Sequence, residues 1–170
     1  MINLPENSEV NLWFEDDLFC QVNLWFCISL LSKNKDLKIY RVFPKTSEKD
    51  HWKGFSVSTN SDLKESLRSK VVFKEKDVEI ALHLWKAYQN QDKILLKQLS
   101  ANESDCFYFL KEVIDVYSNK DPEVFIKNLI ENGTTDFNSI FKIFQEELGI
   151  FGFGDLQVKS IFEKFSPPKQ

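Results

Sequence analysis

The hydrophobic pattern near the N-terminus changes from alternation to helical spacing within a few residues. Apolar and polar side chains alternate over residues 9–14, which predicts a strand. Apolar side chains then cover most of the helix circumference over residues 18–31, which is typical of a helix packed on a sheet. Residues 37–43 predict a second strand, which Pro44 ends. A strand, a helix and a strand in this order form a βαβ unit, so we expect two parallel strands with a right-handed crossover.

Two parallel strands alone do not make a stable sheet. Further strands must therefore come from another part of the chain or from a partner chain. The segments within the chain that suit a short strand are residues 54–58 and 71–73. Residues 45–54, which follow the βαβ unit, form a polar loop that carries His51.

The pattern after residue 75 is helical. Capping residues and apolar stripes predict a series of amphipathic helices with short turns. We therefore expect an α/β piece over residues 1–75 with a short parallel sheet, followed by a helical subdomain over residues 76–170, so that the protein is predominantly helical. No sharp linker separates the two, and we expect them to pack together. The predicted helices cover residues 59–68, 77–88, 93–99, 105–117, 122–132, 136–147 and 156–165, the last three forming a tri-helical unit.

The charge balance argues against broad nucleic-acid binding. The formal net charge is −4, whereas binding to the phosphate backbone depends on neutralisation by basic groups. Arg41 and Arg68 are the only arginines, and arginine is the preferred bidentate ligand of phosphate and guanine. We therefore expect a protein partner rather than a nucleic acid.

Cysteine usage and the N-terminus favour the cytoplasm. The three cysteines, Cys20, Cys27 and Cys106, form no CxxC pair and favour small buried thiols over a disulfide framework. No basic region precedes a short apolar one, and no apolar run reaches the roughly 18 residues of a membrane span. We expect a cytoplasmic protein with no membrane partner.

Three acids, Glu15, Asp16 and Asp17, follow the first predicted strand and are called the strand-end acids here. Ligands of open parallel sheets bind beyond the carboxyl ends of strands, so these acids could hold a divalent cation. Glu15, Asp17, Gln21 and His51 are the candidates for catalysis, with one acid as a general base. In the simpler interpretation, Asp16 or Asp17 caps the next helix and the other acids face water. Gln21 could then satisfy the backbone at the end of the strand.

The last three predicted helices have the lengths and short turns of a helix-turn-helix-like unit. If they bind DNA, the final helix would offer Gln157, Lys159 and Lys164. The preceding helix carries Glu146 and Glu147, whose charges would repel phosphates. Plain helical packing is the favoured interpretation.

Three segments share their pattern with one bacterial protein family. The first is the most specific, and the other two are a tryptophan-containing helix and a C-terminal segment. They read Trp13-Phe14-Glu15-x-Asp17-Leu18-Phe19-Cys20-Gln21-x-Asn23-Leu24, Ala81-x-x-x-Trp85-x-Ala87-Tyr88, and Ile140-Phe141-x-x-Phe144-Gln145-Glu146 with Gly152-x-Gly154-Asp155-Leu156-Gln157. Together they resemble the bacterial domain-of-unknown-function 1835 family over nearly the whole chain.

Two departures from that pattern shape the functional hypotheses. Members often have His where this chain has Asp16, and they usually begin with another α/β segment that this chain starts too late to contain. The resemblance thus implies a truncated α/β subdomain, and any site built from the missing segment together with Glu15 and Asp17 would be incomplete here or completed by another chain. The family carries no established activity to transfer.

The leading hypothesis is a non-enzymatic interaction or regulatory module without a cofactor, whose sheet is completed by a protein partner or a second copy. No complete catalytic set is visible in the sequence. The alternative is an enzyme that binds a metal or a nucleotide at the strand-end acids, with a divalent cation as its only expected cofactor. A DNA-binding regulator that acts through its C-terminal helices is the third hypothesis.

Overall fold

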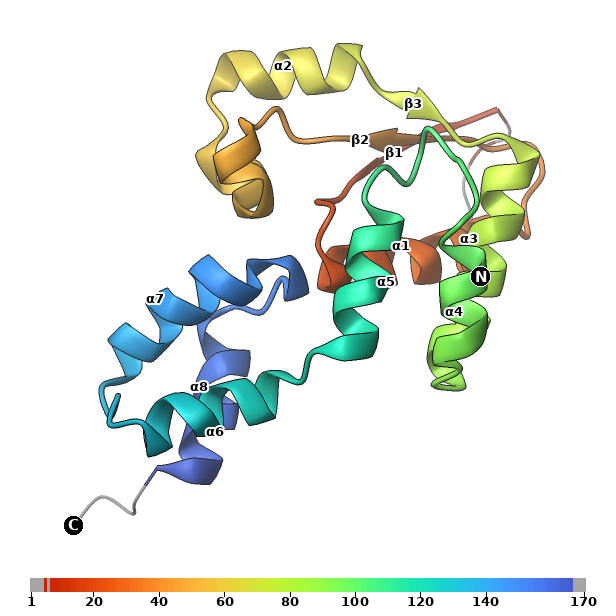
Figure 1. The fold of residues 1–170 in the computed structure, drawn as a ribbon. Coiled ribbons are helices and arrows are strands. Elements are labelled where there is room, and N and C mark those ends of the chain that lie inside the picture. The colour runs from red at the N-terminus through yellow and green to blue at the C-terminus, as the bar shows by residue number, and fades with distance from the viewer. Residues whose placement is uncertain (1–4, 6, 167–170) are drawn as a thin grey trace.

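The structure is a computed structural model that describes residue 5 and residues 7–166. Its N-terminal part is a short sheet with a βαβ unit, and the rest of the chain is mostly helical, which confirms the predicted fold class. The sheet lies at one end of the molecule, and the C-terminal helices lie at the other (Figure 1). Among the described residues, no helix combines the length and the apolar character needed to cross a membrane.

The sheet has three strands in the order β1, β2, β3. β1 (Glu9–Trp13) and β2 (Lys38–Val42) are parallel, with Val10 opposite Ile39. β3 (Val71–Val72) pairs with β2 in the antiparallel direction, so the sheet is mixed rather than purely parallel.

The strand predicted over residues 54–58 is wrong, and the loop predicted over residues 45–54 is a loop only as far as Ser47. Residues 54–58 lie in and directly after η1, a 3-10 helical segment (Glu48–Val57). Gly54 has a φ of 53°, which interrupts regular structure. The next amide, that of Phe55, donates to the Glu15 carboxylate instead of to a neighbouring strand. A long-range contact of this kind leaves no pattern in the local sequence.

Most helices begin where the capping residues predict. Thr59, Asp92, Asp121 and Asp136 each accept a hydrogen bond at a helix N-terminus. The N-cap of the last helix is Gly154. Asp155, which the sequence suggested as the cap, lies in the first turn instead. The helices are α1 (Leu18–Leu31), α2 (Asn60–Arg68), α3 (Glu75–Gln89), α4 (Lys93–Leu99), α5 (Leu110–Asn119), α6 (Pro122–Glu131), α7 (Phe137–Leu148), η2 (Gly149–Phe151, a 3-10 turn) and α8 (Asp155–Phe165).

Helix α5 begins five residues later than the prediction of 105–117. Residues 105–109 form turns instead, and the carbonyl of Cys106 accepts a hydrogen bond from the guanidinium of Arg41. This contact with a buried charged side chain takes the carbonyl that a regular helix would use internally. The apolar stripe of the segment is real, but a tertiary contact sets where the helix starts.

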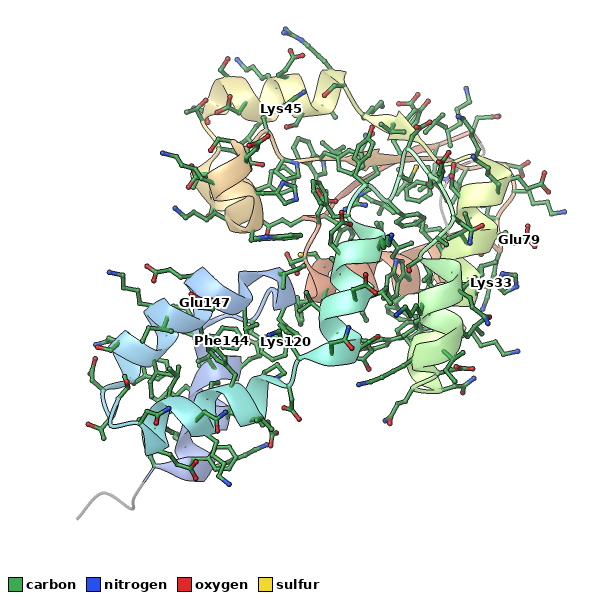
Figure 2. The ribbon with its side chains drawn as sticks, viewed as in Figure 1. Lys33, Lys45, Glu79, Lys120, Phe144 and Glu147 are labelled. Atoms are coloured by element: carbon green, nitrogen blue, oxygen red, sulfur yellow. The ribbon has the colours of Figure 1, made fainter. Side chains whose placement is uncertain are left out.

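Two hydrophobic cores organise the packing. The first lies between the sheet and α1, α3, α4 and α5, and includes Leu24, Ile28 and Ile39. The second lies among α6, α7 and α8, where the fully buried Phe144 points into the helical unit (Figure 2). Val22 of α1 packs against both cores, so α1 connects the sheet to the C-terminal helices.

Candidate functional site

The strand-end acids lie between the end of β1 and the start of α1. The chain leaves the strand at Phe14 and enters the helix at Leu18, so all three acids fall in one short connection. Asp16 and Asp17 are buried, and Glu15 is half-buried. The interpretation in which two of the three face water is therefore wrong.

Asp16 forms a buried ion pair with Arg41 of β2. Arg41 Nη2 lies 2.7 Å from Asp16 Oδ1, and the arginine side chain has no exposed surface. The same guanidinium donates to the carbonyls of Glu15 and Cys106 and lies over the ring of Phe43, with Cζ 4.4 Å from its centroid. Burial raises the pKa of Asp16, while the positive charge of Arg41 opposes that rise. The pair links the end of β1 to β2 and to the start of α5.

Asp17 is the N-cap of α1, as one of the two capping predictions proposed. Its Oδ1 accepts the amide of Cys20 at 2.8 Å. Gly152, in the turn after η2, lies directly against this carboxylate. A Cβ atom at position 152 would stand only 1.8 Å from Asp17 Oδ1. The cap of α1 therefore also forms a contact with the C-terminal helical unit.

Glu15 is held by the η1 segment. Its Oε1 accepts the amide of Phe55 at 2.7 Å, and a Cβ atom at Gly54 would stand 1.9 Å from its Cδ. Burial raises the pKa of Glu15, and the nearby charges of Asp17 and Asp16 raise it further, while the Phe55 amide lowers it. The carboxyl thus anchors η1 to the end of β1.

Gln21 satisfies the strand-end backbone, as one interpretation of the sequence proposed. Its Nε2 donates to the carbonyl of Asp16 at 2.8 Å, and the side chain is fully buried. Its Oε1 is buried and has no hydrogen-bond partner among the described residues. The glutamine therefore fixes the connection that carries the acids.

His51 is brought to the same cluster by η1. Its Nε2 lies 3.5 Å from Asp16 Oδ2, which is within the distance of an ion pair. The two atoms do not form a hydrogen bond. Its Nδ1 lies 3.4 Å from Thr46 Oγ1. The ring packs on Phe109, with centroids 3.9 Å apart, and against Trp52. The sequence near His51 offered no partner for it, because its partner lies at the end of β1.

Arg41 is the residue of this cluster that sequence reasoning missed. Its signal was available, since it is one of two arginines and lies in a strand predicted to be part of the sheet. A charged residue that is fully buried usually has a partner of opposite charge. The three adjacent acids at the end of the neighbouring strand were the obvious partners.

A possible ligand set differs from the predicted trio of acids. Glu15, Asp17 and Cys20 each offer a ligand atom, and these atoms lie within 4.8 Å of one another. Asp16 is directed to Arg41 instead. Burial raises the pKa of the Cys20 thiol to about 12, so a cation would have to displace its proton.

The residues predicted for DNA contact lie on α8. Gln157, Lys159 and Lys164 are all exposed. Lys164 Nζ forms an ion pair with the carboxylate of Glu123 in α6. This pairing reduces the positive charge that α8 can offer to phosphates, and it favours the packing interpretation of these helices.

The burial of Glu15 predicts a pH-dependent contribution to stability. Its pKa in the folded protein lies above the ordinary value of 4.5, so the folded state keeps the proton to higher pH than the unfolded chain. The contribution is therefore fully present below pH 4.5 and is lost as the pH rises through the folded-state pKa. We expect the stability of the wild type relative to Glu15→Gln to fall between acidic and neutral pH in urea unfolding experiments.

Glu9 provides a control of opposite sign. Its pKa is lowered by a hydrogen bond and ion pair with Lys70, so its contribution is present above the ordinary pKa and is lost as the pH falls. The stability of the wild type relative to Glu9→Gln should therefore rise over the same pH range. If the stability difference between wild type and variant changed with pH in the same direction for Glu15→Gln and Glu9→Gln, burial would not be what raises the pKa of Glu15.

The surroundings of the strand-end acids are therefore those of a junction. Asp16 binds β2, Asp17 caps α1 beside Gly152, and Glu15 binds η1. In comparisons with known proteins, no family model, no curated protein and no solved structure matches this chain. The resemblance to the domain-of-unknown-function 1835 family stays a prediction.

Proposed function

We propose that this protein is a non-enzymatic interaction module that receives a strand and a helix of another polypeptide. The observation that carries the proposal is the outer edge of β1, which is unpaired among the described residues, together with the exposed apolar side chains of α1. An open edge and an apolar helix face together are what the next strand and helix of an α/β sheet would cover.

The outer edge of β1 presents a regular row of backbone groups. Lys38 N–H donates to the carbonyl of Ser8, so residues 8, 10 and 12 direct their backbone groups to β2. The intervening residues, Glu9, Asn11 and Trp13, direct their amides and carbonyls outward. β1 stands at the end of the strand order, so no other described strand pairs with these groups.

Helix α1 exposes large apolar side chains on the side turned away from the sheet. Phe19, Phe26 and Leu30 are 47%, 41% and 42% exposed. They fall on one face of a helix with 3.6 residues per turn. Contiguous exposed apolar surface of this kind marks interaction sites more often than ordinary surface. The outer face of α1 is defined here as Phe19, Cys20, Asn23, Phe26, Cys27 and Leu30.

One flank of this face adjoins the outer edge of β1. Helix α3 follows β3, which lies beyond β2, and it contacts α1 through Trp25 and Tyr88, with centroids 6.2 Å apart. Cys20 and Cys27 lie roughly 150° around the helix from Trp25. They therefore occupy the flank opposite α3, which is the β1 side. A partner strand on β1 and a partner helix on this flank would form one continuous surface.

The strand-end acids favour this function over catalysis. Each of the three carboxylates already has a partner that supports the fold, namely Arg41, the Cys20 amide or the Phe55 amide. These contacts use one oxygen of each carboxylate, so each acid already has a role in the fold. The acids are accounted for by the junction that positions β1 and α1.

Site-specific photo-crosslinking in native cells tests the proposal. A photoreactive phenylalanine replaces Trp13 at the end of β1 or Phe26 on α1, and Leu156 of α8, which is 75% exposed, serves as the control position. We expect the same adduct from positions 13 and 26 and none from position 156. Absence of an adduct at both test positions, or an equal yield at the control, would contradict the proposed interface.

A further inference from the structure

We infer that the polypeptide received at this interface is a second copy of the same chain. The two copies would pair β1 with β1 in the antiparallel direction about a twofold axis at Asn11, with α1 packed beside α1. The inference rests on the proposed function and names its partner. Three properties of the surface support a second copy: the register of the edge, the spacing of the helices and the absence of charge on α1.

The register of the outer edge is self-complementary. Outward backbone groups occur at Glu9, Asn11 and Trp13, symmetrically about Asn11. An antiparallel pair centred on Asn11 therefore places Glu9 opposite Trp13 of the other copy and lets about six backbone hydrogen bonds form. No like charges face each other in this register. The two three-stranded sheets would become one six-stranded sheet, and the twofold axis closes the assembly without leaving a further open β1 edge.

The spacing of the sheet brings the two α1 helices into contact. Helix α1 lies over β1 and β2, since Leu24 and Ile28 share the first core with Leu12 and Ile39. Strands are about 4.8 Å apart, so a helix centred over the β1–β2 pair lies about one strand spacing from the twofold axis. The two helices would then be about 9.6 Å apart, which is within the 8–10 Å distance of packed helices.

The chemistry of α1 permits that contact. None of the residues from Leu18 to Leu31 is charged, so two antiparallel α1 helices meet without repulsion. The flanks that face each other carry Cys20, Asn23 and Cys27, which are small or neutral and half-buried in one copy. Small side chains let helices approach closely, and Leu30 borders the contact, whereas Phe26 packs on Trp85 of α3 with centroids 5.2 Å apart.

Light scattering after size-exclusion chromatography tests the inference. The wild type at micromolar concentration is expected at about 40 kDa, twice the chain mass of 20.0 kDa. Asn11→Pro removes an outward amide that the β1–β2 ladder does not use, so it should give a folded monomer. Its matched control, Asn11→Ala, keeps the amide and should remain a dimer.

A second pair of variants tests the helix contact independently of the strand. Cys27→Glu places two like charges beside the twofold axis and should halve the mass, whereas Leu82→Glu, at an exposed apolar position on α3, should not. Circular dichroism and thermal melts confirm that each variant is folded. If Asn11→Pro fails to fold, Cys27→Glu still decides the outcome.

The mass measurements and the crosslinks together distinguish a wrong partner from a wrong function. A monomeric wild type, or a dimer that persists in both folded test variants, overturns the second copy as partner. If crosslinks at positions 13 and 26 then capture a different protein, the interaction function stands without the dimer. If the positions capture nothing, both proposals fail.

Discussion

Arg41→Met is expected to lower the free energy of unfolding by about 3–5 kcal/mol, because removing one partner of a buried ion pair leaves the other charge uncompensated. Asp16 would stay buried without the guanidinium that lies 2.7 Å from its Oδ1. The carbonyls of Glu15 and Cys106 would also lose their donor. Urea unfolding followed by circular dichroism measures the effect.

Arg68 provides a matched control, since it is the other arginine of the chain. Its side chain is 77% exposed and lies 3.9 Å from Glu65. Arg68→Met should change the free energy of unfolding by less than about 0.5 kcal/mol. Adding Asp16→Asn to Arg41→Met removes the orphaned charge, so the double variant should be more stable than Arg41→Met alone. Equal losses at positions 41 and 68 would show that the Asp16–Arg41 pair does not hold the sheet to α1.

The elements that the sequence predicts well are those whose signals are local. The bounds of α1 follow from an acidic cap and an uninterrupted apolar run, and α6 follows from Asp121 and Pro122. The parallel pairing of β1 and β2 follows from the βαβ order. Each of these depends on residues within a few positions of one another, so periodicity and capping chemistry suffice.

The features that the sequence does not predict depend on contacts between distant segments. The 3-10 conformation of η1 depends on the Phe55 amide reaching Glu15, and the late start of α5 accompanies the contact between Cys106 and Arg41. His51 lies beside Asp16 only because η1 folds over the end of β1. The location of the cluster at the strand end and the presence of Glu15, Asp17, Gln21 and His51 in it were therefore predictable, whereas the contact with Arg41 was missed.

In the proposed interaction module, the strand-end acids would hold the binding surface in place. The open edge of β1 is short, and a short isolated strand is held in place only by its neighbours. Asp16 fixes the end of β1 to β2, and Asp17 fixes the start of α1. The connection between them is thus rigid, so β1 and the outer face of α1 keep one relative position. A preformed surface of this kind loses less conformational entropy when it binds.

Gly152→Ala is expected to lower the free energy of unfolding by about 3–5 kcal/mol, combining left-handed strain, a steric clash and a weakened helix cap. Gly152 has a φ of 68°, and a Cβ atom there would stand 1.8 Å from Asp17 Oδ1. The new methyl group would push the carboxylate away from the Cys20 amide. Urea unfolding of the variant measures the loss.

Gly133→Ala is the control that distinguishes the cost of the steric clash from the cost of backbone strain. Gly133 has a φ of 94°, and nothing lies within 4 Å of the position that its Cβ would take. Gly133→Ala should therefore cost only the left-handed strain of about 1–2 kcal/mol. In an Asp17→Ala background the clashing carboxylate is absent, so the additional cost of Gly152→Ala should fall toward that of Gly133→Ala, although the Cβ of residue 17 would still stand 3.0 Å away. If the cost of Gly152→Ala is unchanged by Asp17→Ala, the cap of α1 does not hold the C-terminal helices against the α/β part, and the apolar contacts of Leu18 and Val22 must connect α1 to them instead.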